Sequence, residues 1–199
     1  MVWNCQGAAS AGFHRTLKQL IWEHKPSIVC LLEPKVSGDQ ANAICAGFGF
    51  SEWVRVEAFG FSGGIWILWK ETLLVNIMFT HPQFAVLQVG EGRSEPWFLS
   101  VVYGSPNLQL RRSLFSDLSS QSLGIQGPWL TAGDYNTVAS QSEVSNPGTF
   151  NSTRCSEFNE WIFREGLIDL GFEGPNITWR RGINSETFKG ARFTDWIEH

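Results

Sequence analysis

The sequence has little charge of either sign, no long hydrophobic run and no paired cysteines. Charged residues make up 17% of the 199 residues and the net charge is −4, so the chain as a whole does not attract nucleic acid and any DNA contact must come from a local patch. The longest apolar stretch, Ile65–Trp69, is far too short to span a membrane. The N-terminus has no charged lead before an apolar stretch, so we expect no secretory signal.

The cysteines exclude a disulfide framework or a zinc site as the organising element. Cys5, Cys30, Cys45 and Cys155 show neither a CxxC pair nor zinc-ligand spacing. Cys30 lies within the apolar run 27–32 and is expected to be a small buried hydrophobe. We expect all four to be reduced, which indicates an intracellular protein.

What the chain does have is apolar and aromatic material. The apolar fraction is 43% and aromatic residues reach 14%, with 10 Trp, which is typical of a globular protein with a thick core. We expect one domain over residues 1–199. Both ends look abrupt, because Val2-Trp3 is only a strand stub and the chain stops after Trp196. The domain is therefore expected to be truncated at its C-terminus and slightly at its N-terminus.

Hydrophobic periodicity predicts strands mixed with helices. Helical spacing of apolar residues follows Ser10, a possible N-cap, and ends at Pro26. Further helices are expected over 110–118 and near 153–164. Strands are expected over 27–32, 65–69, 73–79, 84–89, 97–103, 129–132, 177–179 and 187–193. Hairpins interrupted by helices favour two sheets with helices packed outside them, and an all-β fold fits this order poorly.

Polar residues interrupt the apolar pattern at the ends of predicted strands. Asn4, Glu33 and Tyr103 each close a strand, and Asp134 and Asn136 follow another. Loops at one end of a sheet commonly build an enzyme site. A carboxylate pair suits Mg²⁺, which takes a few carboxylate oxygens and keeps some waters, and phosphoryl transfer needs positioning and charge neutralisation.

Each of these residues has a structural explanation when it is taken alone. A Glu after a strand commonly caps it or faces solvent, Gly133-Asp134 is a common turn, and Tyr103 could be an ordinary strand-end aromatic. The ordered set is what favours a site.

Four short motifs occur in an order that resembles the endonuclease/exonuclease/phosphatase superfamily. They are WNCQG from Trp3, LEPK from Leu32, VYGSPN from Val102 and GDYN from Gly133. Two further segments, GGIWILWK from Gly63 and LIDLGF from Leu167 with Thr178-Trp179, look most like the endonuclease domains of plant LINE-type retrotransposons.

The resemblance implies a DNase I-like fold, a four-layer α/β sandwich of two mixed sheets flanked by helices. It also implies that the protein nicks DNA with the help of Mg²⁺, or Mn²⁺ in its place, and contacts the phosphate backbone. A retroelement endonuclease of this kind is expected to be a monomer and to act in the nucleus. By the motif match, Glu33 is the metal ligand and Asn4 lies beside it. Asp134 would position the attacking water, Asn136 would orient Asp134 and phosphate, and Tyr103 would contact phosphate.

Two departures from the family pattern weaken the prediction of activity. The Arg-apolar-Asp motif is present only as Arg192 to Asp195, with one residue too many, so Asp195 is a weaker catalytic candidate. The closing Ser-Asp-His is absent, so the fold is expected to lack its final strand. The site is then also expected to lack the histidine donor, and the loss of such a donor typically lowers the rate ~10²–10³-fold. We therefore expect little or no nicking.

Two alternatives remain open from the sequence. The segment from 180 to 192 has more basic than acidic residues, with Arg180, Arg181, Lys189 and Arg192 but only Glu186 as an acid. The chain could therefore be a non-catalytic remnant that binds nucleic acid. It could also belong to a phosphatase branch of the same superfamily.

Overall fold

A computed structural model describes most of the chain. The described residues are 1–57, 63–90, 94–122, 124–146, 150, 152–171, 179–181, 189–191 and 194–198. For residues 153 and 154, and for those from 179 onward, only the backbone is described.

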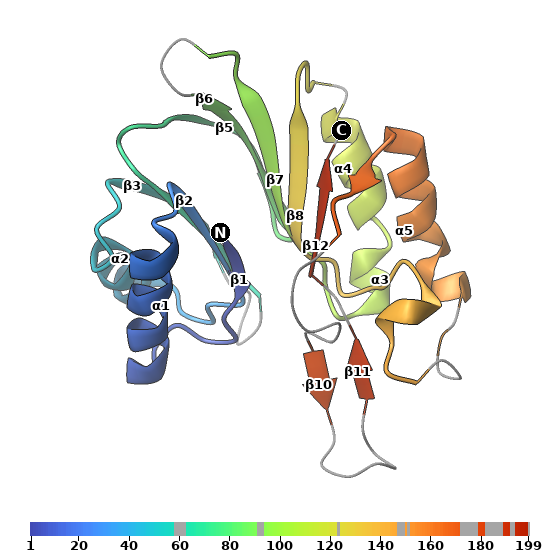
Figure 1. Ribbon diagram of the computed structural model, residues 1–199, viewed down its shortest axis with the longest axis horizontal. Coiled ribbons are helices and arrows are strands. Elements are labelled where there is room, and N and C mark those ends of the chain that lie inside the picture. Colours follow the sequence, from blue (N-terminus) through green and yellow to red (C-terminus); the bar gives the residue numbers. More distant parts are fainter. Residues whose placement is uncertain are drawn as a thin grey trace.

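The first sheet is built from the N-terminal part of the chain and has four strands (Figure 1). In spatial order they are β1 (Val2–Asn4), β2 (Ile28–Leu32), β4 (Ile65–Trp69) and β3 (Glu52–Val56). β1 runs parallel to β2, and the other neighbours are antiparallel. Helices α1 (Ala11–His24) and α2 (Gly38–Ala46) cover its outer face.

The second sheet has six strands and carries the C-terminal helices on its outer face. In spatial order the strands are β5 (Leu74–His81), β6 (Phe84–Gly90), β7 (Trp97–Tyr103), β8 (Trp129–Asp134), β12 (Thr194–Glu198) and β9 (Ile168–Asp169). The helices are α3 (Leu108–Arg111), α4 (Leu114–Ser122), α5 (Ser152–Glu165) and the 3-10 turn η1 (Gln141–Glu143). Strands β10 (Trp179–Arg181) and β11 (Lys189–Ala191) form a separate hairpin.

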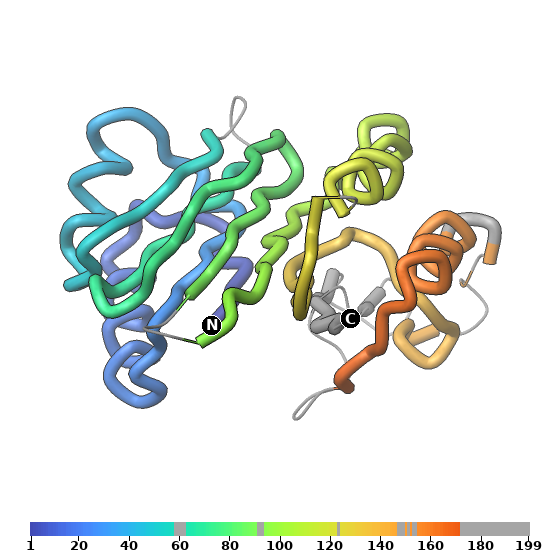
Figure 2. The backbone as a smooth tube through the Cα atoms, turned by 90° about the horizontal axis from the view of Figure 1, so that it is seen from above, coloured from blue at the N-terminus to red at the C-terminus, as the bar shows by residue number. Residues whose placement is uncertain are grey.

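Three hydrophobic clusters correspond to the three interfaces of a four-layer sandwich. One places Phe13 and Leu17 of α1 against the first sheet, and another places Phe158 and Trp161 of α5 against the second. The third lies between the sheets and includes buried residues of β2, β4, β6 and β7. Figure 2 shows α4 and α5 together on the side of the molecule away from α1 and α2. The predicted four-layer α/β sandwich of two mixed sheets flanked by helices is confirmed.

Helix α1 forms as its sequence predicts. The Ser10 hydroxyl accepts a hydrogen bond from the Phe13 amide at 3.0 Å, which satisfies one of the free N–H groups of the first turn. At the other end Lys25 adopts a left-handed conformation with φ of 47°, one residue before Pro26. The strands predicted over Ile65–Trp69 and Trp97–Tyr103 have the predicted bounds.

The single helix predicted over 110–118 is wrong, because the structure has two helices, α3 and α4, separated at residues 112 and 113. Leu114 and Leu118 are buried, whereas Leu110 is 63% exposed, so Leu110 does not belong to the apolar stripe. Its carbonyl accepts a hydrogen bond from the Gln83 side chain at 2.8 Å. Helix α2 and strands β3 and β9 were not predicted from the sequence.

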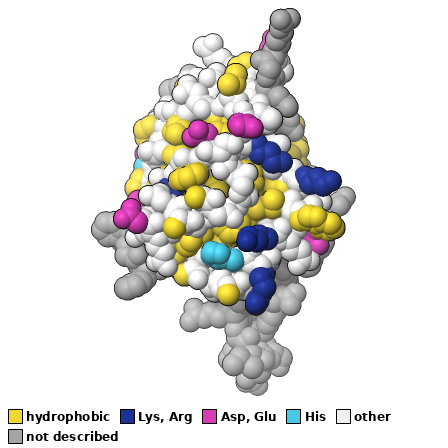
Figure 3. Space-filling view, turned by 90° about the vertical axis from the view of Figure 1, so that its left-hand side faces the viewer, with side chains coloured by type: hydrophobic (Ala, Val, Ile, Leu, Met, Phe, Trp, Pro, Cys, Tyr) yellow, Lys and Arg dark blue, Asp and Glu magenta, His cyan; other side chains and the backbone are white. Residues whose placement is uncertain are grey.

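The outer face over α1 and α2 carries charges of both signs. Figure 3 shows basic and acidic side chains on this face, lying among hydrophobic ones, and Trp22 of α1 is 76% exposed. The described residues of this face therefore do not form the basic stripe that marks a DNA-binding surface. All four cysteines are free, and Cys30 is buried as predicted. Among the helices that the structure describes, none has the length and apolar character needed to cross a membrane.

Candidate active site

Five polar residues predicted from the sequence meet where strands of both sheets end. Because β1 and β2 are parallel, Asn4 and Glu33 lie at the same edge of the first sheet. Tyr103 and Asp134 are paired neighbours at the ends of the parallel strands β7 and β8. Asn136 follows two residues after Asp134, and hydrogen bonds join the residues of the two sheets.

Asn4 connects the two carboxylates. Its side-chain nitrogen donates to Asp134 Oδ2 at 2.8 Å and to Glu33 Oε1 at 3.3 Å. One amide group therefore lies between two acids that are 101 residues apart in the chain, from residue 33 to residue 134. The opposite assignment of this amide would place its oxygen against two carboxylates, so the hydrogen bonds fix its orientation.

Asp134 is buried and its pKa is raised. Only 6% of the residue is exposed, and this burial raises the pKa of the carboxyl from 3.8 to about 6. Hydrogen bonds from the Asn136 backbone N–H, at 2.9 Å, and from Asn4 oppose that rise, while the charge of Glu33 adds to it. A carboxylate with such a pKa can take up a proton near neutral pH.

Asn136 is held in place by the turn that follows Tyr103. Its side-chain nitrogen donates to the Gly104 carbonyl at 2.8 Å, and its φ of 50° is a left-handed conformation. A Cβ at Gly104 would lie 2.4 Å from the Tyr135 carbonyl oxygen. Only glycine fits at this position, and it brings the two turns close enough for the Asn136 contact.

Tyr103 bears its hydroxyl toward Glu33. The residue is 5% exposed, and burial, followed by the charge of Glu33, raises the pKa of the phenol. Tyr103 also hydrogen-bonds to the Glu33 side chain. The phenol therefore stays protonated at physiological pH and remains a hydrogen-bond donor.

Lys35 lies next to the site. It was part of a motif in the sequence, but no role was predicted for it. Its ammonium lies 2.9 Å from Glu33 Oε2, in a pair whose side chains are 36% and 17% exposed. Both residues adopt a positive φ, 53° for Glu33 and 55° for Lys35. Non-glycine residues in this region cost energy and are concentrated at functional sites.

The donor set fits a hard divalent cation. The Asn4 Oδ1 atom is buried and, in the described part of the chain, has no hydrogen-bond partner, so its lone pairs are unused in an amide whose nitrogen contacts the Glu33 carboxylate. Among the described residues no group of three or more His, Cys, Asp or Glu forms a closed metal cage. Mg²⁺ does not require one, because it is held by one or two carboxylates and keeps several waters.

For Asp195 the structure describes only the backbone. Its backbone lies in β12 opposite Gly133, and Thr194 is the residue paired with Asp134. The side chain of Asp195 lies outside the described atoms, so its catalytic role stays a prediction. In the basic segment, Arg180 pairs with Gly190 and Arg181 with Lys189 in the β10–β11 hairpin, whereas Glu186 and Arg192 lie outside the described residues.

Two supporting residues were missed by the sequence analysis. Arg111 donates to the Ser105 carbonyl at 2.6 Å, and its charge lowers the pKa of Asp134. Glu143 is 4% exposed and accepts a hydrogen bond from the Ala139 backbone N–H at 2.8 Å, which fastens the loop after Asn136. Asn107 caps the helix that carries Arg111, so an N-cap residue at this position could have located it, whereas Glu143, in a polar loop, offers no such signal.

A comparison with protein families decides the relationship. The family model described as Endonuclease/Exonuclease/phosphatase family matches residues 1–192. The chain belongs to the Endonuclease/Exonuclease/phosphatase family. This match covers Asn4, Glu33, Tyr103, Asp134 and Asn136, so the predicted superfamily resemblance is confirmed. A search of curated proteins found no match to the chain.

Solved structures of nucleic-acid enzymes share this fold. The chain resembles the 3′ phosphatase NExo from Neisseria, bound to a product DNA hairpin, with 16% identity and a TM-score of 0.71 over 99% of this chain and 84% of that one. It also resembles the endonuclease domain of TRAS1, a telomere-specific non-LTR retrotransposon, with 15% identity and a TM-score of 0.68 over 98% of this chain and 82% of that one. For the AP endonuclease LMAP from Leishmania major, the identity is 15% and the TM-score is 0.75 over 99% of this chain and 77% of that one. At these identities the likeness shows the fold, which agrees with the predicted DNase I-like architecture.

Proposed function

We propose that this member of the Endonuclease/Exonuclease/phosphatase family hydrolyses phosphodiester bonds in DNA with the help of Mg²⁺, or Mn²⁺ in its place. The proposal rests on one observation, the Asn4 side chain that joins Glu33 and Asp134 across the two sheets. This contact gathers a metal-binding oxygen set and a titratable acid at one place. The DNA-bound and DNA-processing relatives support nucleic acid as the substrate.

Asp134 is the residue that takes the proton of the attacking water. With a pKa of about 6 it is ionised at pH 7.5 and still basic enough to accept a proton. The backbone N–H of Asn136 holds Asp134 Oδ1 at 2.9 Å, and Asn4 holds Oδ2 at 2.8 Å. These two donors fix the carboxylate plane, so little reorganisation is needed when Asp134 takes the proton and the water attacks the phosphorus.

Two donors would serve the phosphate oxygens. The second amide hydrogen of Asn136 is not used by its bond to Gly104, whereas the single hydrogen of the Tyr103 phenol is bound to Glu33 and would turn to the phosphate once Glu33 holds the ion. Preorganised donors of this kind stabilise charge that develops in the transition state.

Glu33, with the open Oδ1 of Asn4, would hold the divalent ion. When bound, the ion supplies charge neutralisation at the phosphate and lowers the pKa of its waters. Lys35 already occupies one side of Glu33, so it competes with the ion or moves to the phosphate when substrate arrives.

We further propose that catalysis by this chain is slow. In the part of the chain that the structure describes, none of the histidines hydrogen-bonds to the five clustered residues: His14 contacts the Ala8 carbonyl, and His81 contacts Gln83. The site thus has no described imidazole donor for the scissile phosphate. A donor of that kind typically contributes ~10²–10³ in rate.

The experiment is a nicking assay on supercoiled plasmid with Mg²⁺ or Mn²⁺ over long incubation. We expect weak nicking that chelation abolishes and that is lost in Glu33→Gln, while Glu52→Gln, an exposed acid on β3, behaves as the wild type. Nicking that persists unchanged in Glu33→Gln would refute the proposed site. If nicking is rapid and Glu33→Gln abolishes it, the proposed function is supported and the proposed low rate is refuted.

The biological setting is part of the same proposal. The retrotransposon endonuclease among the similar structures supports a retroelement origin of the LINE type. A protein of that kind would act as a monomer in the nucleus, where its DNA target lies.

A further inference from the structure

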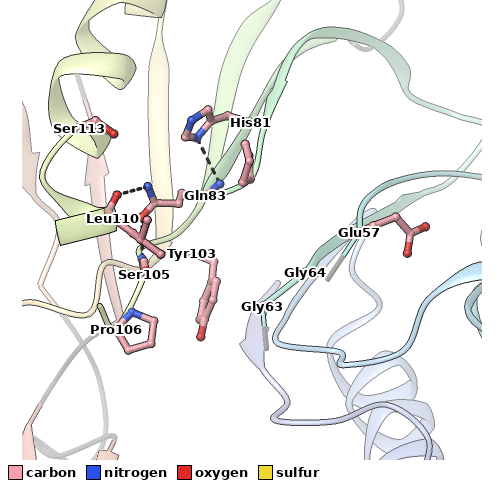
Figure 4. A pocket seen from close by; sticks show the side chains of 11 residues that line it. Glu57, Gly63, Gly64, His81, Gln83, Tyr103, Ser105, Pro106, Leu110 and Ser113 are labelled. Carbon is pink, nitrogen blue, oxygen red and sulfur yellow. Dashed lines mark hydrogen bonds between the residues drawn. The ribbon is translucent and has the colours of Figure 1, made fainter. Parts of the chain in front are cut away.

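A pocket of about 350 Å³ lies next to the catalytic cluster, and Tyr103 belongs to both (Figure 4). Its walls come from Gly63 and Gly64 before β4, from His81 and Gln83 in the β5–β6 turn, and from Leu110 of α3. Elements of both sheets therefore enclose it. Nothing in the proposed hydrolysis requires this space.

The walls of the pocket are neutral and mostly apolar. None of its described lining residues is Lys or Arg. Burial lowers the pKa of His81, although Asp117 opposes the shift, so the ring is uncharged at neutral pH. Glu57, the acid in the lining, is paired with Arg55 at 2.5 Å. The described lining thus offers a phosphate neither Lys nor Arg, whereas an uncharged group with apolar faces would fit.

The polar side chains in the wall are already engaged in holding the pocket open. The Gln83 amide accepts from the Ser105 N–H at 2.7 Å and donates to the Leu110 carbonyl at 2.8 Å. The His81 Nδ1 atom accepts from the Gln83 N–H at 3.2 Å. These contacts make the β5–β6 turn and the segment after Tyr103 one rigid unit.

Gly63 leaves space beside the aromatic ring of Tyr103. A Cβ on Gly63 would lie 3.6 Å from Tyr103 Cε1, and its φ of 81° is a conformation that side chains rarely adopt. A side chain longer than a methyl group at this position would therefore crowd the ring edge of Tyr103 and the pocket that the two residues line.

We propose that this pocket holds the nucleobase of a nucleotide adjacent to the phosphate bound at Asn4, Glu33 and Asp134. The Tyr103 hydroxyl faces Glu33 and its ring borders the pocket, so the phosphate and its neighbouring base would contact opposite ends of one side chain. Base stacking on aromatic residues tolerates any base, because every base has a π-face. The proposal rests on the proposed function for the position of the phosphate and adds that the site takes an unpaired base.

The test measures binding without chemistry. Single-stranded tetranucleotides, each with one abasic residue at a different position, are titrated against the protein with Ca²⁺ in place of Mg²⁺, so that a divalent ion is present at the carboxylates, and followed by fluorescence anisotropy. At one position, removal of the base is expected to weaken binding roughly 5- to 100-fold. Ser113→Trp, which places a ring in the pocket from an exposed lining position, should remove that difference, and Ser116→Trp on the exposed side of α4 should keep it.

Thermal unfolding at the same temperature for both variants would show that Ser113→Trp is folded. Equal binding of all the abasic tetranucleotides, or a base effect that survives in Ser113→Trp, would overturn the proposal. A free deoxynucleoside that competes as well as a tetranucleotide would overturn the assignment to a bound strand. Because the titration measures binding and not cleavage, a base effect in a protein that cuts nothing would support the pocket and refute the nuclease.

Discussion

The side-chain nitrogen of Asn4 lies 2.8 Å from a carboxylate oxygen of Asp134, and the two residues belong to different sheets. The same nitrogen reaches Glu33 at 3.3 Å. This contact connects the halves of the site, together with the hydrogen bond between Tyr103 of the second sheet and Glu33 of the first.

Replacement of Asn4 by Ala should raise the pKa of Asp134 above about 6, because one of the two hydrogen bonds that lower it is lost. Any nicking rate should fall by roughly 10²-fold or more, since the metal-facing oxygen is lost as well. The pH profile of nicking distinguishes the two effects. An unchanged profile with an unchanged rate would show that Asn4 does not position Asp134.

The buried carboxyl of Asp134 should make the protein less stable as pH rises from about 4 to about 6. Its folded-state pKa of about 6 lies above the unfolded value, so the native state holds the proton that the unfolded state has already released. Stability from this group is full below pH 4 and is lost as pH rises through 6. In Asp134→Asn this loss disappears, which gives the variant a relative gain of ~2 kcal/mol between pH 4 and 7.

Urea unfolding at several pH values measures that gain. Asp39→Asn, at an exposed position in the first turn of α2, is the matched control and should follow the wild type. Parallel curves for Asp134→Asn and the wild type would contradict the raised pKa.

Lys35→Met should strengthen metal binding. The ammonium of Lys35 lies 2.9 Å from Glu33 and competes with a cation for that carboxylate. Because the pair is partly exposed, the effect is modest, roughly two- to fivefold in Kd. Titration of Mn²⁺ followed by electron paramagnetic resonance measures it in the absence of DNA, with Lys18→Met on the exposed face of α1 as control. Weaker binding in Lys35→Met would show that the lysine supports the ion instead.

Gly133→Ala should destabilise the fold by ~3 kcal/mol or more. The glycine has a φ of 154°, and an added Cβ would lie 1.9 Å from the Val102 carbonyl oxygen, where β7 and β8 run side by side. Gly12→Ala in α1, which has room for a methyl group, should be neutral or stabilising. Chemical denaturation of the two variants makes the comparison. Equal stability would mean that the strands can separate at Gly133 without cost.

The sequence by itself determined many of the elements and named the five polar residues that meet at the site. Alternation and runs of apolar residues placed β4 and β7 correctly, and Ser10 and Pro26 marked the ends of α1, because these signals depend on neighbours along the chain. The polar residues that end the strands could be named for the same reason. The division of 110–118 into two helices could not be predicted, since Gln83, from a distant turn, binds the Leu110 carbonyl.

Only the tertiary structure decided how these residues act on one another. The meeting of Asn4 with Asp134 depends on how two sheets pack, and the raised pKa of Asp134 depends on burial that no local pattern encodes. The same holds for the pocket beside Tyr103, whose walls come from both sheets. Local propensity specifies which residues end a strand, whereas long-range packing specifies the distances and the solvation on which their chemistry depends.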